Sequence, residues 1–199
     1  MKIAFLSVLA LAVAAPIAAQ ATQSPLAVKA GTYKTDPNHT LVGFDVNHFG
    51  FTEFFGMFPG ATGRLTLDPK AIAATKLDVS VPIARVSTTN ATLDGELRSA
   101  EWFDAERYPS ARFVSARVTP TGPRTAKITG TITLHGVSRP LVLDATFGGA
   151  GANPLSKAYT VGFQASGHLK RSDFGVSKYV PLVGDEVKLT ISGAFEKTN

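Results

Sequence analysis

"LVGFDVNHFGFTEFFGMFPG", residues 41–60, begins with a strict alternation of side chains. Val42, Phe44, Val46 and His48 fall on one face of an extended chain, and glycine or polar residues fall on the other. A period of two is the signature of a β-strand with one buried face. The stretch therefore predicts a strand whose inner face is largely apolar.

The second half of this stretch, FGFTEFFG, breaks the alternation. Adjacent rings cannot all point inward from one strand, so some of Phe49, Phe51, Phe54 and Phe55 must cap the mouth of a cavity or lie exposed. Six of the chain's thirteen phenylalanines lie in residues 41–60, beside four glycines. This composition favours the lining and entrance of an apolar tunnel, with a packed core as the alternative.

The same alternation returns along the chain and predicts an antiparallel all-β protein. With further strands near residues 64–67 and 111–118, the count reaches about eight, which can close a barrel and remove exposed edges. Turn signals lie at Asp68-Pro69, Thr121–Pro123, Gly136–Pro140 and Gly148–Pro154. The alternating positions on the expected inner face are Leu77, Val79, Val81, Ile83; Ile128, Gly130, Ile132, Leu134; Leu141, Leu143, Ala145, Phe147; Val161, Phe163, Ala165, Gly167, Leu169; and Val187, Leu189, Ile191, Gly193, Phe195.

One segment, residues 87–104, has helical spacing instead. Leu93, Leu97 and Ala100 recur at helical intervals after polar residues that favour a helix start. The segment ends in Trp102-Phe103, an aromatic pair that we expect to pack as a plug against one end of the barrel. The sequence thus predicts one short helix in an otherwise all-β fold.

Residues 1–21 have the features of a secretory signal peptide. A single basic residue, Lys2, precedes an apolar run, and Ala19-Gln20-Ala21 matches the small-x-small pattern of a signal peptidase site. The apolar run is shorter than the roughly 18 residues that a membrane span needs, and no later stretch comes close. We expect an exported protein that does not span a membrane.

The rest of the chain fits one domain without disulfide bonds. The absence of cysteine suits a bacterial periplasm and excludes a lipid-modified cysteine at the cleavage site. Residues 22–30 are polar and unpatterned, so we expect a flexible lead-in before a barrel domain over residues 31–199. The net charge is +5 with basic residues scattered singly, so no nucleic-acid partner is predicted.

The motifs that carry common enzymatic chemistry are absent from the sequence. There is no H-E-x-x-H or G-x-S-x-G pattern, no phosphate-binding glycine loop and no cysteine nucleophile. The four histidines are far apart in sequence, and we predict no metal and no cofactor. For His48 the sequence leaves two interpretations open: a structural histidine bonded to backbone, or a polar group that holds the head of a ligand in an apolar pocket.

Small residues occupy several of the expected inner positions. Gly130, Ala145, Ala165, Gly167 and Gly193 fall in register with large apolar residues. In a barrel of eight strands, small inner residues either accommodate a taper or leave a void that can hold one small ligand. A hollow barrel would be a carrier, whereas a filled barrel would be a dry interaction module.

Four segments match, in order, the motifs of one known family. The stretch DPNHTLVGFDVNHFGFTEFFGMFPG resembles the D-x-x-H-S-x-V-x-F-x-V-x-H-x-G opening of the YceI-like family. The similarity continues through LRSAEWFDAERYPSARFVS, ITGTITLHGVSRPLVLDATF and SGHLKRSDFGV, and four ordered motifs are far more specific than one short pattern. One departure is Glu96, which stands where the family often has a histidine in a D-x-H-L motif.

The resemblance implies a lipocalin-like antiparallel barrel in the periplasm that binds a polyisoprenoid or similar lipid and has no established catalytic role. We expect the ligand to be an isoprenoid lipid, either a polyisoprenoid or an isoprenoid quinone, and an enzyme acting on such a lipid is the alternative. A homodimer and transient contact with a membrane surface are left open. The expected ligand-binding residues are Phe44, Val46, His48, Phe51, Phe55, Phe58, Trp102, Phe113, Ile132, Leu143, Phe163, Ala165 and Gly167.

Overall fold

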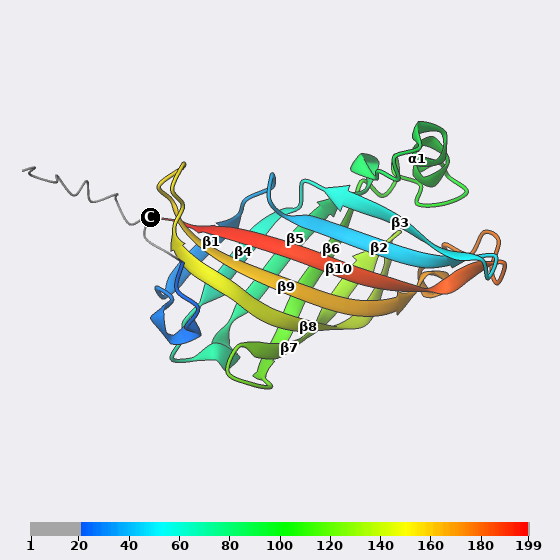
Figure 1. Ribbon diagram of the computed structural model, residues 1–199. Helices are drawn as coiled ribbons and strands as arrows, with labels where there is room; N and C mark the ends of the chain where they lie inside the picture. Colours follow the sequence, from blue (N-terminus) through cyan, green and yellow to red (C-terminus); the bar gives the residue numbers. More distant parts are fainter. Residues whose placement is uncertain (1–20, 199) are drawn as a thin grey trace, which may run out of the picture.

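The computed structural model describes residues 21–198, and its main body is a β-barrel with one α-helix at one end (Figure 1). The predicted signal peptide, apart from Ala21, lies outside the described residues. The strands are β1 (Gly31–Thr35), β2 (Leu41–His48), β3 (Thr52–Pro59), β4 (Thr62–Leu67), β5 (Lys76–Pro82), β6 (Ser110–Pro120), β7 (Thr125–Leu134), β8 (Val137–Ala152), β9 (Tyr159–Lys170) and β10 (Val183–Lys197). The helix is α1 (Ala91–Arg98), and short 3₁₀ helices are η1 (Pro25–Ala27), η2 (Ile72–Ala74), η3 (Ile83–Arg85) and η4 (Arg171–Phe174).

The ten strand segments form a closed antiparallel barrel with eight strand positions, because two of these positions are each shared by two consecutive segments. The order is β1-β4-β5-β6-β7-β8-β9-β10-β2-β3, and β1 also pairs with β10, which closes the ring. β1 and β2 pair with successive parts of the same edge of β10, so they continue one another. β3 and β4 continue one another in the same way, beside β2 and β1. The predicted eight-stranded antiparallel barrel with one short helix is therefore confirmed.

The break between β1 and β2 is held to the barrel by Thr40. Its hydroxyl donates to the carbonyl of Ala194 and accepts from the amide of the same residue, at 3.1 Å in both cases. The amide of Asp36 also donates to the Ala194 carbonyl, at 2.8 Å. Because these bonds replace the missing ladder at a buried position, the amide and carbonyl of Ala194 stay paired where the chain bends between β1 and β2.

Several expected element boundaries were wrong. Residues 49–56, where the alternation fails in the sequence, contain the hairpin turn and the first part of β3 (Thr52–Pro59), a full antiparallel partner of β2. The expected turn at residues 136–140 is confined to His135 and Gly136, whose φ angles of 50° and 75° let β8 begin at once. The expected loop at residues 148–154 lies mostly within β8, which continues past a bulge near Phe147.

The helix is shorter than the helical spacing predicted. α1 is capped by Asn90, whose side chain accepts from the amides of Thr92 and Leu93, and it ends at Arg98. Trp102 and Phe103 lie in the turns that follow it. Both still pack into the core cluster at this end, with Leu97 and Phe58, so the expected aromatic plug is present but is not helical.

The segment predicted to be a flexible lead-in packs against the opposite end of the barrel. Thr22 forms a β-bridge with Ala150, and the amide of Lys29 donates to the hydroxyl of Tyr159 at 3.3 Å. Val28 is buried in a core cluster with Tyr33 and neighbouring strand residues. Residues 22–30 therefore cover one end of the barrel, while α1 covers part of the other (Figure 1). Among the described residues, no helix is long and apolar enough to cross a bilayer.

Candidate functional site

Two apolar cavities occupy the inside of the barrel. The η1-side cavity, lined by η1 and by the strand ends near it, has a volume of about 330 Å³. The α1-side cavity, lined by α1 and by residues after it, has a volume of about 300 Å³. Both are lined by Val42, Val81, Ile132 and Leu189, so the two compartments adjoin one another near the middle of the barrel. An elongated ligand that occupied both would run along much of the barrel.

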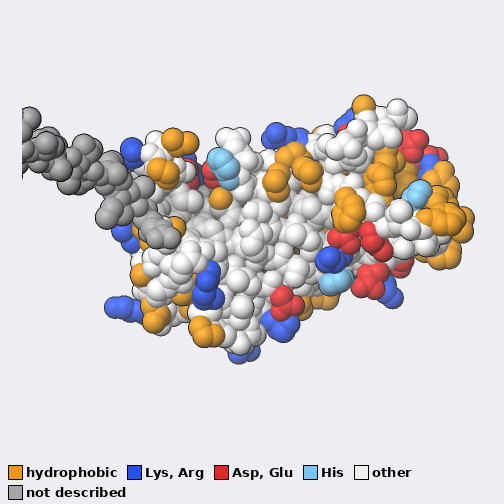
Figure 2. All heavy atoms as spheres, viewed as in Figure 1, with side chains coloured by type: hydrophobic (Ala, Val, Ile, Leu, Met, Phe, Trp, Pro, Cys, Tyr) orange, Lys and Arg blue, Asp and Glu red, His pale blue; other side chains and the backbone are white. Residues whose placement is uncertain are grey.

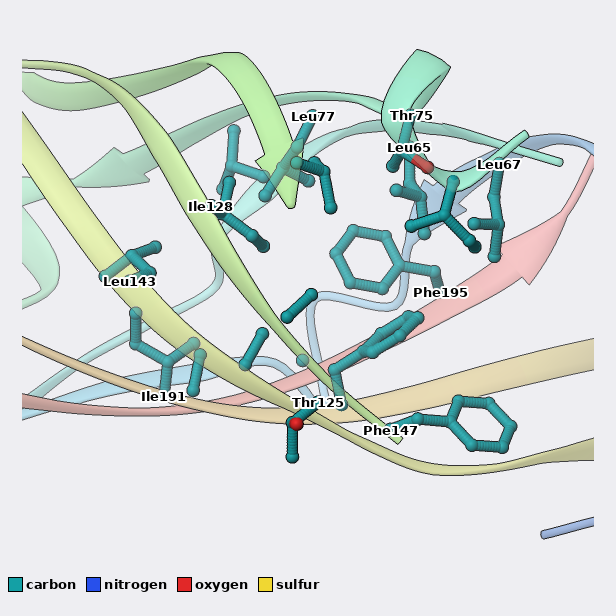
Figure 3. A pocket seen from close by; sticks show the side chains of 18 of the residues that line it. Leu65, Leu67, Thr75, Leu77, Thr125, Ile128, Leu143, Phe147, Ile191 and Phe195 are labelled. Atoms are coloured by element: carbon teal, nitrogen blue, oxygen red, sulfur yellow. The ribbon is translucent and has the colours of Figure 1, made fainter. Parts of the chain in front are cut away.

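The wall of the η1-side cavity consists almost entirely of hydrocarbon (Figure 3). Leu65, Leu77, Ile128 and Phe195 lie around it, from four different strands. Its few polar contributors are Thr40, Thr75, Arg124 and Thr125. A wall of this kind holds a ligand through burial of apolar surface rather than through specific hydrogen bonds.

Many inward side chains remain half-buried although they face the interior. Val42, Phe44, Phe163, Ala165 and Ile191 all line the cavities and are only partly buried. In a packed core these side chains would be closed off by their neighbours, as Val161 is with no exposed surface. Their residual exposure reflects hollow space inside the barrel.

The wall of the α1-side cavity is also almost entirely apolar, but it includes a few residues with polar or ionisable side chains. His48, Glu96, Trp102, Arg171 and Tyr179 all contribute to its wall. The indole Nε1 of Trp102 is buried and has no hydrogen-bond partner. The side chain of His48 packs edge-on against Phe49, with ring centroids 4.3 Å apart. This compartment can therefore interact with a polar group as well as with a hydrocarbon chain.

Arg171 is a buried cation at the base of this compartment. Its guanidinium donates to the carbonyls of Val176, Val183 and Gly184, each at 2.8 Å, and lies 5.5 Å from the centre of the Trp102 ring. Burial lowers the pKa of Arg171, and the negative charge of Asp185 opposes that shift. The bonds to Val183 and Gly184 tie η4 to the start of β10, and the bond to Val176 holds the turn after η4, so Arg171 fixes the backbone at this end of the barrel.

Most residues that the sequence assigned to the ligand line one of the two cavities. Ile132 lines both compartments. The α1-side cavity contains Phe44, Val46, His48, Phe58 and Trp102. The η1-side cavity contains Phe113, Leu143, Phe163 and Ala165.

Three of the expected residues lie elsewhere, and the expected lining is corrected accordingly. Phe51 is 86% exposed at the tip of the β2–β3 hairpin, and Phe55 is 67% exposed. Phe55 pairs with Asp45, so the pleat directs it to the outer face of the barrel. At Gly167 a Cβ atom would lie 2.8 Å from Cδ2 of Leu143, so this glycine accommodates a neighbouring side chain and leaves no void for a ligand.

Other lining residues were missed by the sequence reasoning. Pro25, Leu26 and Val28 reach the η1-side cavity from the segment that was read as a flexible lead-in. Arg171 was not singled out because a lone arginine after a strand carries no periodic signal. The apolar spacing of Leu26 and Val28 was the available clue for the first group.

A cluster of exposed apolar side chains, the apolar tip, lies beside the α1-side cavity. It is formed by Phe49, Phe51, Tyr179 and Leu182, which are 46%, 86%, 54% and 61% exposed. The amide of Phe49 donates to the carbonyl of Leu182 at 2.9 Å, which joins the β2–β3 hairpin to the β9–β10 connection. Hydrophobic side chains gather at this end of the molecule in Figure 2. Phe49 and Tyr179 also line the cavity, so the tip and the interior are continuous.

The sequence model of the YceI-like domain family matches residues 33–195. The chain belongs to the YceI-like family. Among its YceI-like relatives, the UPF0312 protein plu2095 of Photorhabdus laumondii is 36% identical over 165 residues, which cover 82% of this chain and 85% of the relative. A UPF0312 protein of Azotobacter vinelandii is 35% identical over 154 residues, covering 77% and 80% of the two chains.

Solved structures show the same fold. The YCEI protein of Campylobacter jejuni superposes with a TM-score of 0.68 at 31% identity, covering 77% of this chain and 90% of that one. BcnA of Burkholderia cenocepacia has a TM-score of 0.72 at 24% identity, covering 80% and 98%. A polyisoprenoid binding domain from Saccharophagus degradans has a TM-score of 0.63 at 13% identity, covering 85% and 100%. The last two comparisons establish the fold alone.

Proposed function

We propose that this YceI-like protein binds a long isoprenoid lipid inside its barrel and carries or sequesters it. The observation that carries the proposal is the pair of adjoining apolar cavities, about 330 and 300 Å³ in volume. An apolar tail that leaves water for such a wall gains roughly 25 cal/mol per Å² of buried surface. No catalytic step is needed for this role.

The comparisons support an isoprenoid in particular. The structural neighbour from Saccharophagus degradans is a polyisoprenoid binding domain, and its fold covers 85% of this chain. Among the described residues, no group of three or more His, Asp or Glu side chains could hold a metal ion. The polar groups of the α1-side cavity, including His48, are few and surrounded by apolar side chains, which is typical of a binding pocket.

The apolar tip supports a route for loading the lipid. Phe51 and Leu182 project at the end of the barrel where the α1-side cavity is lined by Phe49 and Tyr179. A transient contact between this tip and a membrane surface would place the cavity entrance beside the lipid source. Aromatic rings suit such a contact because they settle at the interface between lipid and water.

The location that fits this role is the bacterial periplasm. The features of residues 1–21 support export by a cleaved signal peptide. Cell fractionation and N-terminal sequencing test this part of the proposal. We expect the protein in the periplasmic fraction with Thr22 as its first residue, and an exported pool that begins with Met1 would contradict it.

Native mass spectrometry of protein purified from its own host tests the binding role. We expect a non-covalent adduct that organic extraction removes, and an isoprenoid lipid in the extract. Incubation of the delipidated protein with the same lipid should return the lipid unchanged, whereas a chemically altered product would favour the enzymatic alternative. Protein that carries no adduct and takes up no isoprenoid probe would refute the proposal.

A further inference from the structure

Two buried side-chain polar atoms of the described residues have no hydrogen-bond partner, and each is part of a residue that lines one of the cavities. The two atoms are Nε1 of Trp102, a residue that lines the α1-side cavity, and Oγ1 of Thr75, a residue that lines the η1-side cavity. A buried polar group without a partner costs roughly 1–3 kcal/mol, so such groups are rare in folded proteins. These two atoms mark where a polar part of a ligand could be held.

The two atoms differ in how deeply their residues are buried and in which hydrogen bonds they can make. Trp102 is 8% exposed, and its indole nitrogen can only donate a hydrogen bond. Thr75 is only partly buried, and its hydroxyl can rotate and can either donate or accept. The tryptophan therefore specifies its partner more narrowly: the missing group must be an acceptor.

The surroundings of Trp102 also favour an acceptor. The buried guanidinium of Arg171 lies 5.5 Å from the centre of the indole ring and brings a positive charge to this wall. His48 and Tyr179 line the same compartment, and Tyr179 packs against the indole with ring centroids 6.1 Å apart. An oxygen that carries partial negative charge would be stabilised by both the N–H group and the nearby cation.

We propose that Trp102 Nε1 donates a hydrogen bond to an acceptor oxygen on the head of the bound isoprenoid, with the head in the α1-side cavity and the tail in the η1-side cavity. This assignment rests on the proposed function, and it adds the chemical class of the head and the direction in which the lipid lies. The tail then lies in the η1-side cavity, near the apolar side chains of Leu65, Leu77 and Ile128.

A pair of matched probes tests the assignment with delipidated protein. One probe is an isoprenoid methyl ketone, and the other is the hydrocarbon of the same length in which CH₂ replaces the carbonyl. One net hydrogen bond corresponds to about a fivefold difference in affinity, so wild-type protein should bind the ketone about fivefold more tightly. Trp102→Phe keeps an aromatic ring and removes the donor, so the preference should vanish and the variant should bind the two probes with equal affinity.

Thr75→Val is the matched control, because it removes the other buried polar atom that has no hydrogen-bond partner. This variant should keep the preference for the ketone. A preference that survives in Trp102→Phe, or that disappears in Thr75→Val instead, would overturn the assignment. Equal binding of both probes by the wild type would overturn the assignment and leave the proposed function standing. Binding of neither probe would mean that the proposed function itself is wrong, and the assignment would fall with it.

The wild-type protein also provides a measurement that needs no variant. Trp102 is the single tryptophan of the chain, so a ¹⁵N-labelled sample gives one indole N–H signal. We expect the ketone to shift this signal downfield and the hydrocarbon to shift it much less, because only the ketone accepts a hydrogen bond. Equal shifts with the two probes would contradict the assignment even if Trp102→Phe failed to fold.

Discussion

The aromatic ring of Phe44 lies over Gly56 on the neighbouring strand. The two residues pair directly between β2 and β3, and a Cβ atom at position 56 would lie 2.6 Å from Cε1 of Phe44. The glycine thus makes room for a ring on the inner face, where Phe44 also contacts Phe58 at a centroid distance of 5.4 Å. On β6 and β7 the ring of Phe113 also lies over a glycine, Gly130, which is not its direct partner; a Cβ atom there would lie 2.6 Å from Cζ of the ring. At these two positions the missing side chain of glycine leaves the space that a neighbouring phenylalanine ring of the protein occupies.

Gly56→Ala should therefore displace the Phe44 ring and destabilise the barrel. We expect a loss of about 1–3 kcal/mol in the free energy of unfolding, the usual range for overpacking a buried site. Gly95→Ala is the control, because a Cβ atom there meets nothing within 4 Å and alanine favours the helix interior. Chemical denaturation should show opposite signs for the two variants, and an unaffected Gly56→Ala protein would contradict the packing argument.

Ala165→Trp should fill part of the η1-side cavity and block the ligand. Ala165 lines that cavity from β9, so the added ring gains apolar contacts without displacing a packed neighbour. We expect lipid binding to fall sharply while the thermal stability of the delipidated protein is kept or raised. Gln164→Trp, at an exposed position on the same strand, should bind lipid normally. A destabilised Ala165→Trp protein would instead indicate an interior without spare volume.

Phe51→Ser should slow the transfer of lipid between vesicles and the protein. Phe51 is 86% exposed on the apolar tip, and burial of a phenylalanine at a membrane surface is worth about 1.5–3 kcal/mol, so partial insertion predicts a fall of roughly tenfold. Leu155→Ser is the control, because Leu155 is 90% exposed in the β8–β9 connection, away from the tip. Unchanged transfer by the Phe51→Ser protein would exclude this residue from the membrane contact.

Stability should decline between pH 10 and pH 12 because of Tyr33. Burial, with a smaller effect of Tyr159, raises the pKa of Tyr33 from 10.0 to about 12. The phenol therefore stays neutral in the folded protein while it ionises in the unfolded chain, so its contribution is complete below pH 10 and is lost as the pH rises through the folded pKa.

Tyr33→Phe checks the origin of this slope. The variant loses the hydrogen bond from Tyr33 to the carbonyl of Lys29, so it should be less stable at neutral pH. Its free energy of unfolding should nevertheless depend less on pH between 10 and 12 than that of the wild type. Denaturation curves across this range give the comparison, and equal slopes would assign the decline to other groups.

Local pattern was enough to predict the barrel and much of its lining. Period-two alternation of residues such as Val42, Phe44 and Val46 depends only on the geometry of an extended chain, so it indicates which side chains share a face before any partner strand is known. The same reasoning predicted that the crowded rings of residues 49–55 could not all face inward. The structure places Phe49 and Phe54 on the cavity wall and leaves Phe51 and Phe55 exposed.

The sequence by itself determined the all-β class, the apolar inner face and the family, because these depend on the order of residues along the chain. Only the tertiary structure decided which glycines were filled by neighbouring rings, that residues 22–30 close one end, and that the buried Nε1 of Trp102 has no partner. Each of these depends on contacts between residues distant in sequence, such as Thr22 with Ala150 or Trp102 with Arg171. No local period records such contacts, since register and closure are set by the packing of the whole barrel.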